Sequence, residues 1–149
     1  MFYRRKIILA LIQLLGGELE KIRIQKLLFL FSQKKKNPEY EFIPYKFGCY
    51  SFSANADLNT MVKNSSLLEN ENFYIKNIAD DFIKTLKVED KKILNEVVHL
   101  YGKMNSGNLI KHTYINFPYY AINSTIVDTV LDDTQLKKVK NLKKGGTET

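Results

Sequence analysis

The chain has 149 residues, 44% apolar and 26% charged, which suits one globular domain with a sizeable core and excludes a disordered protein. Its apolar runs, such as residues 27–31, are far too short to cross a bilayer. Gln13 interrupts the apolar stretch that could imitate a signal peptide, and no small-residue cleavage site follows it. Cys49, the only cysteine, can form no internal disulfide. We therefore expect a cytoplasmic protein.

The net charge of +7 is distributed unevenly along the sequence. Residues 1–36 contain nine Lys and Arg against two acids, and residues 137–149 contain five Lys against one acid. The central part carries thirteen acids against nine basic residues. Such an asymmetry can attract nucleic acid or an acidic protein surface. The alternative for the lysine triplet 34–36 is that it solubilises a helix end, where cations also suit the helix dipole.

Two apolar helices are predicted at the start. Apolar residues recur at helical spacing over residues 3–15, and Gly16 and Gly17 offer a left-handed stop. After a turn through Glu18 and Leu19, residues 20–36 carry an apolar stripe wide enough to predict a helix buried on most of its circumference. Asn37 and Pro38 end it.

A connection, a third helix and a hairpin follow. Residues 39–48 alternate as an extended segment, which Pro44 limits to an edge or a bent strand, and Gly48 provides the turn. A helix is predicted over residues 51–68, with Ser51 or Ser53 as its N-cap. Residues 65–77 predict a short hairpin with polar turn residues at 69–72.

The remaining sequence predicts more helix. One helix is expected over residues 88–104, and a shorter one begins at Asn105 or Ser106 and stops before Pro118. One or two further helical turns are expected before residue 145. We predict a mainly α (α+β) fold with a winged-helix-like core of three helices and a hairpin, followed by additional C-terminal helices. A single domain over residues 1–142 and a flexible tail over 143–149 are expected.

Several spaced motifs resemble a known family. The run Gln25-Lys26-Leu27 on the second helix and the turn residues Gly48, Tyr50 and Ser51 are similar to the SocA-type (Panacea) antitoxin domain and its YwgA-like relatives, found at the N-terminus of longer bacterial proteins. Cys49 stands where that family usually has proline. The resemblance covers roughly residues 5–76. It implies a non-enzymatic domain that binds and neutralises a toxin, or delivers it to a protease, in a toxin–antitoxin or phage-defence setting.

The aromatic connection is the first candidate binding site. Five aromatic residues come at near-alternate positions between 42 and 52, so we expect Phe47 and Phe52 inside and Tyr45 and Tyr50 exposed beside Lys46. Exposed tyrosines suit a protein interface. The alternative is that all five rings form core under a long loop. The predicted partner-binding residues are Arg23, Lys26, Tyr45, Lys46 and Tyr50.

Nucleic acid is the alternative partner. In a winged helix the third helix enters the major groove, so Asn55, Asn59 and Lys63 would face DNA while Arg4 and Arg5 contact phosphates. Glu69 and Glu71 at the hairpin tip work against this, because phosphate contacts dominate affinity.

No catalytic constellation is expected. His99 and His112 lie on separate predicted helices, and His99 should be a partly buried helix residue. The pairs 80–81 and 132–133 are interpreted as capping or surface acids. We expect no enzyme, cofactor, metal, small-molecule substrate or membrane partner.

Overall fold

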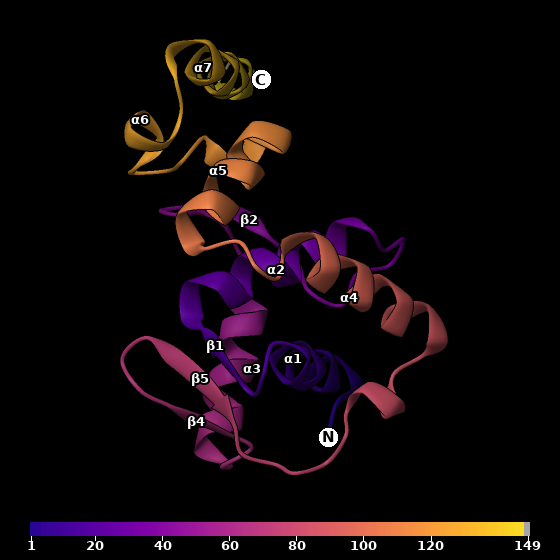
Figure 1. Ribbon diagram of the computed structural model, residues 1–149. Coiled ribbons are helices and arrows are strands. Elements are labelled where there is room, and N and C mark those ends of the chain that lie inside the picture. The colour runs from indigo at the N-terminus through magenta and orange to yellow at the C-terminus, as the bar shows by residue number, and fades with distance from the viewer. Residues whose placement is uncertain (148–149) are drawn as a thin grey trace. The chain divides into compact units, whose positions relative to one another are not determined.

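The computed structural model describes residues 1–147, and the chain forms two compact units. The first comprises Met1–Glu41 and Ser51–Lys103, and the second comprises Phe42–Tyr50 and the chain from Met104 onward. Helices dominate both units, and short strands form one small sheet in each, so the mainly α (α+β) prediction is confirmed (Figure 1). Whether the units amount to the single domain expected over residues 1–142 stays a prediction.

The first unit contains four helices, three strands and one 3₁₀ turn. In chain order they are α1 (Tyr3–Leu14), β1 (Glu18–Glu20), α2 (Lys21–Gln33), α3 (Phe52–Lys63), β4 (Leu67–Glu69), β5 (Phe73–Lys76), η1 (Ile83–Thr85) and α4 (Val88–Tyr101). The predicted order of helix, helix, connection, helix and hairpin is confirmed.

Helices α1 and α2 form the centre of this unit. Residues 7–12 of α1 are all fully buried, and residues 24–32 of α2 are all buried. A helix buried on every side needs neighbours all round, and α1 packs against β1, β5, η1 and α4. Gly16 and Gly17 then turn the chain at φ of +97° and +98°, which only glycine adopts without strain. The predicted stop is confirmed.

The sheet of the first unit has the order β1-β5-β4, with both pairs antiparallel. The Asn70 side chain shapes the β4–β5 turn by accepting hydrogen bonds from the backbone amides of Asn72 and Phe73. The sequence predicts only a turn at Glu18 and Leu19, whereas these residues belong to β1. Three residues are too few for a periodic signal, and Leu19 alone is buried.

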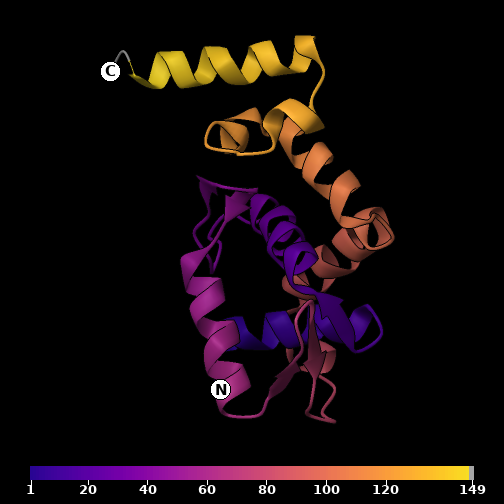
Figure 2. The ribbon, with the colours of Figure 1, turned by 90° about the vertical axis from the view of Figure 1, so that its left-hand side faces the viewer.

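The second unit contains a hairpin, one 3₁₀ turn and three α-helices. In chain order its elements are β2 (Ile43–Tyr45), β3 (Gly48–Tyr50), α5 (Ser106–Asn116), η2 (Pro118–Ala121), α6 (Val127–Val130) and α7 (Asp133–Thr147). Asn105 caps α5 by accepting from the amide of Asn108. Figure 2 shows α7 as one uninterrupted helix, longer than the one or two turns predicted from the sequence.

Side-chain caps account for two further helix starts. Ser51 accepts from the Ala54 amide at α3, so it is the cap of the two serines predicted. Asp132 and Gln135 cap α7 reciprocally, each side chain accepting from the other residue's amide. The predicted flexible tail begins at residue 143, but α7 continues to Thr147. The last two residues of that tail lie outside the described part of the chain.

Gly48 provides a test of the second unit. Its φ is +93°, and a Cβ atom there would lie 2.5 Å from Cε1 of the buried Tyr114. We expect Gly48→Ala to lower the free energy of unfolding by about 1–3 kcal/mol through backbone strain and this clash. Urea denaturation followed by circular dichroism measures the loss.

Gly145 supplies the matched control. It lies in α7 without a positive φ, and a Cβ atom there would meet nothing within 4 Å. Gly145→Ala should leave stability unchanged or raise it by up to about 1 kcal/mol. Equal stability of Gly48→Ala and the parent protein would contradict the close approach to Tyr114.

Candidate functional site

The β2–β3 hairpin presents an apolar face to solvent. The register pairs Ile43 with Tyr50 and Pro44 with Cys49. Because side chains alternate across strands, Ile43, Tyr45 and Tyr50 share one face, while Pro44 and Cys49 share the other. Cys49 is fully buried, so the face with the tyrosines is the outer one.

We call the outer residues of the hairpin and its turn the hairpin surface: Ile43, Tyr45, Lys46, Phe47 and Tyr50. Ile43, Tyr45 and Phe47 are 39%, 36% and 51% exposed, and Tyr50 is half-buried. The rings of Tyr45 and Tyr50 lie 5.3 Å apart, and Lys46 Nζ lies 5.8 Å from the centre of the Tyr45 ring. These contacts place the Tyr45 ring between Tyr50 and Lys46.

Hydrogen bonds from the segment between η2 and α6 hold this hairpin in place. The Lys46 carbonyl accepts from the Thr125 amide at 2.9 Å, and the Pro44 carbonyl accepts from Asn123 Nδ2 at 3.3 Å. Pro44 has no N–H group to donate to a neighbouring strand. It is tolerated here because β2 is an edge strand. Helix η2 packs against β2, and its Tyr119 is 52% exposed.

The expectation that Phe47 and Phe52 lie inside is wrong, since they are 51% and 55% exposed. Phe47 occupies the turn between the strands, and Phe52 is the first residue of α3. Strand alternation does not extend through a turn or into a helix, so it could not place either ring.

The other two predicted partner-binding residues, both on α2, are turned inward. The Arg23 side chain is 15% exposed, and its Nη2 donates to the carbonyl of Gly102. Lys26 is 2% exposed. The structure therefore brings Tyr45, Lys46 and Tyr50 together but does not display Arg23 and Lys26 with them.

Arg4 and Arg5 bind a buried carboxylate within the first unit. Asp57 on α3 is 2% exposed; Arg4 Nε lies 2.6 Å from its Oδ2, and Arg5 Nε donates to Oδ1 at 3.0 Å. The Tyr40 hydroxyl donates to Oδ2 at 2.7 Å. Burial alone would raise the pKa of Asp57, but the hydrogen bonds from Arg4, Tyr40 and Arg5 hold that pKa below its usual value.

A second buried carboxylate, Asp90 on α4, collects another basic residue. Lys35 Nζ lies 2.7 Å from its Oδ1, and the Tyr3 hydroxyl donates to Oδ2 at 2.6 Å. Burial raises the pKa of Tyr3 to about 12, with the Asp90 hydrogen bond adding to it. Lys34 pairs with Glu96, so two of the three lysines in the triplet 34–36 make ion pairs within the unit.

The residues predicted for DNA recognition occupy α3. Asn59 and Lys63 are exposed and Asn55 is half-buried. Lys63 is the one basic residue of α3. On the adjacent hairpin Glu69 pairs with Lys21 at 2.7 Å, and Glu71 is exposed. This face is polar but carries little positive charge.

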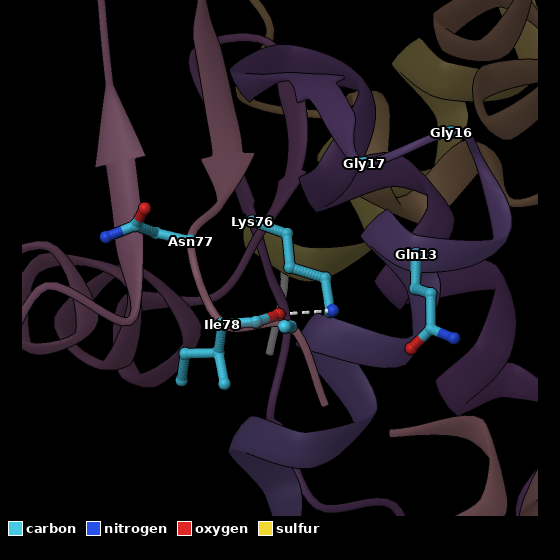
Figure 3. Close-up of a pocket in the computed structure, with 7 residues that line it drawn as sticks. Gln13, Gly16, Gly17, Lys76, Asn77 and Ile78 are labelled. Carbon is cyan, nitrogen blue, oxygen red and sulfur yellow. Dashed lines mark hydrogen bonds between the residues drawn. The ribbon is translucent and has the colours of Figure 1, made fainter. Parts of the chain in front are cut away.

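The widest hollow of the described pockets is a shallow one of about 610 Å³ in the first unit, between the end of α1 and the segment after β5 (Figure 3). Lys76 points across it and donates to the carbonyls of Ile78 and Asp80. Gln13 bonds Asp81 and the Phe82 amide. The described lining of this hollow contains no His, Cys, Asp or Glu, and the side chains of Gln13, Lys76 and Asn77 already bond to neighbouring groups of the protein.

The two histidines lie on different helices, His99 on α4 and His112 on α5. His99 is exposed on α4, so the expectation that it is partly buried is wrong. His112 lies half-buried on α5. Within the described residues, no group of three or more His, Cys, Asp or Glu could hold a metal ion, and no helix is long and apolar enough to cross a bilayer.

Comparison with known proteins adds no assignment. No protein-family model matches the chain, and the search of curated proteins gives no significant match.

The Asp57 cluster predicts a pH-dependent stability. Its lowered pKa means that its contribution is present above the unfolded pKa of about 3.9 and is lost as the pH falls through the lower folded value. Asp57→Asn should lower the free energy of unfolding at pH 7 by about 2–3 kcal/mol, because two partly buried arginines lose their partner. This difference should narrow below about pH 4.

Urea denaturation of both proteins between pH 7 and pH 3 measures the effect. Glu71→Gln is the control, since Glu71 is exposed on the hairpin turn. A constant difference between Asp57→Asn and the parent protein across this range would contradict a lowered pKa.

Proposed function

We propose that the chain is a non-enzymatic, antitoxin-like protein-binding module that acts in the bacterial cytoplasm, in a toxin–antitoxin or defence setting. The hairpin surface is the observation that carries this proposal. Its apolar and aromatic side chains stand in water, where burial against a partner gains about 25 cal/mol per Å² of apolar area. Tyrosines fixed by neighbouring contacts lose little rotamer freedom on binding.

The chemistry of the hairpin surface indicates the chemistry of the partner surface that would fit it. The turn adds one charge, Lys46, to a face made of Ile43, Tyr45, Phe47 and Tyr50. A complementary protein would offer an apolar recess for the rings with a carboxylate near Lys46, so the rings hold the complex and the charge orients it.

The motif of the resemblance has a physical basis in the first unit. Gln25 on α2 donates from Nε2 to the Ser51 carbonyl at 3.2 Å and accepts from the Ser51 amide at 2.9 Å. Ser51 also caps α3. Two parts of the motif that lie 26 residues apart therefore meet in one buried contact, which supports the SocA-type interpretation as a coherent structural unit.

Partner capture tests the proposal. Tyr45→Ala with Phe47→Ala should leave the thermal midpoint within a few degrees, because both rings are exposed, and should weaken partner binding by at least tenfold. A pull-down from the native host with mass spectrometry identifies the partner, and titration calorimetry with that partner measures the loss.

A matched pair of exposed apolar residues provides the control. Val88 and Leu100, 84% and 50% exposed on α4, lie in the first unit. Val88→Ala with Leu100→Ala should retain full binding. Undiminished capture by the Tyr45 and Phe47 variant would rule out the hairpin surface.

A winged-helix DNA-binding regulator is the second candidate. The observation that favours it is the connectivity α1-β1-α2-α3-β4-β5 with sheet order β1-β5-β4, which suits a winged helix and would make α3 the recognition helix. Asn59 and Lys63 are the exposed residues of α3 that could read a major groove.

This candidate has a separate test. The parent protein is first used to enrich a DNA duplex from a random pool. The double variant Asn59→Ala with Lys63→Ala should bind this duplex about 1–3 kcal/mol more weakly and should show a relaxed base preference at the contacted positions. Anisotropy titration measures both. Enrichment of no sequence, or equal binding by the double variant, would remove α3 as a recognition helix.

A further inference from the structure

Helix α7 concentrates positive charge on a well-anchored element. Its residues include five lysines, at 137, 138, 140, 143 and 144, against one acid, Asp133, in its first turn. The reciprocal cap of Asp132 and Gln135 fixes where the helix begins. The helix macrodipole favours cations in the last turn of a helix. It does not explain Lys137 and Lys140, because these residues lie in the middle of α7.

The side of α7 that carries Val139 is covered by its own unit, whereas Leu142 further along the helix is 42% exposed. Val139 is 3% exposed, and α7 packs against η2. Gln135 lines a small cavity of about 20 Å³ with Tyr114 and Pro118, so this side of the helix faces the unit interior.

Three lysines lie on the opposite side, and we call them the lysine ridge: Lys137, Lys140 and Lys144. Their i, i+3, i+7 spacing places them within an arc of about 60° around the helix, facing away from Gln135 and Val139. All three are exposed. At about 1.5 Å of rise per residue, the ridge is about 10 Å long.

Two of the ridge lysines lack an ion-pair partner among the described residues, although the carboxylate of Asp133 lies one turn before Lys137 on the same side of α7. Lys137 and Lys140 make no ion pair with any residue that the structure describes, in contrast to Lys21, Lys34 and Lys35. Like charges three or four residues apart on a helix cost a few tenths of a kcal/mol per pair. A bound polyanion removes this repulsion and releases its own counterions.

We propose that the lysine ridge binds the phosphate backbone of duplex DNA without reading its sequence. Each DNA strand carries a charge about every 3.4 Å of axis while winding around it, so a straight ridge of about 10 Å reaches on the order of two to three phosphates. A lipid surface fits less well, because membrane-bound helices insert a broad apolar face, and Val139 in the apolar stripe of α7 is buried in its own unit. This binding is independent of the protein partner proposed above.

A salt titration tests the ridge. Fluorescence anisotropy with a random duplex of about 20 base pairs between about 50 and 200 mM salt should give a slope of log association constant against log salt of about −3 for the parent protein. Replacing Lys137, Lys140 and Lys144 by Gln should weaken binding at least tenfold at the lower salt concentration. The slope should become less negative by about 2–3.

Two control variants distinguish an effect of the ridge lysines from an effect of net charge and from misfolding. Replacing Lys36, Lys92 and Lys103 by Gln removes the same charge from the first unit and should leave most of the slope intact. Replacing the ridge lysines by Arg keeps the charge and should keep both affinity and slope. Asn59→Ala with Lys63→Ala should change the slope by about 1 or less, since α3 contributes one cation.

Four outcomes of the DNA titrations would overturn the proposal. These are absence of DNA binding by the parent protein, an unchanged slope in the ridge Gln variant, an equal loss in the Lys36, Lys92 and Lys103 variant, and loss of binding in the Arg variant. Binding to vesicles of phosphatidylcholine with phosphatidylserine is measured in parallel for the parent protein and the ridge Gln variant. Ridge-dependent binding to them as tight as to DNA would overturn it as well and assign α7 to anionic lipid.

Discussion

The buried carboxylate of Asp57 is the interaction on which the first unit depends. It lies on α3 and receives Arg4 and Arg5 from the first turns of α1 and the Tyr40 hydroxyl from the segment after α2. A charge at 2% exposure is tolerable only when its oxygens are filled, and here three partners fill them. The same contact therefore orients α1, fixes α3 and ties down the chain that leads to β2.

This internal use of charge changes the meaning of the basic N-terminal sequence. Arg4 and Arg5 neutralise Asp57, Lys35 neutralises Asp90, and Arg23 donates to a helix-end carbonyl. Much of the charge of residues 1–36 is therefore used to hold α1, α2, α3 and α4 together. Net charge along a sequence is a poor guide to a binding face unless the acids that pair with it are known.

Local signals in the sequence predict most of the elements. Apolar periodicity identifies α1, α2, α3 and α4, the paired glycines end α1, and Ser51 and Asn105 begin α3 and α5. Strand β1 is missed because its three residues carry no period, and its pairing with β5 joins segments far apart in the sequence. The full length of α7 is missed because its lysines hide a narrow apolar stripe.

The candidate site is harder to predict because burial is decided by distant partners. Arg5 and Asp57 lie 52 residues apart, Tyr3 and Asp90 87 apart, and nothing local marks either pair. The aromatic connection illustrates the same limit, since alternation places Tyr45 correctly but fails for Phe47 in the turn and for Phe52 at the start of α3. Residue type predicts the interface chemistry, whereas exposure needs the fold.

Within the second unit, one short helix supports both proposed surfaces. Helix η2 packs against β2, which carries part of the hairpin surface, and against α7, which carries the lysine ridge. The two surfaces work through different forces, because aromatic burial acts at contact while lysine charge acts across about a Debye length. Rising salt therefore weakens the ridge far more than the hairpin surface, which lets the two kinds of binding be separated in one protein without changing its fold.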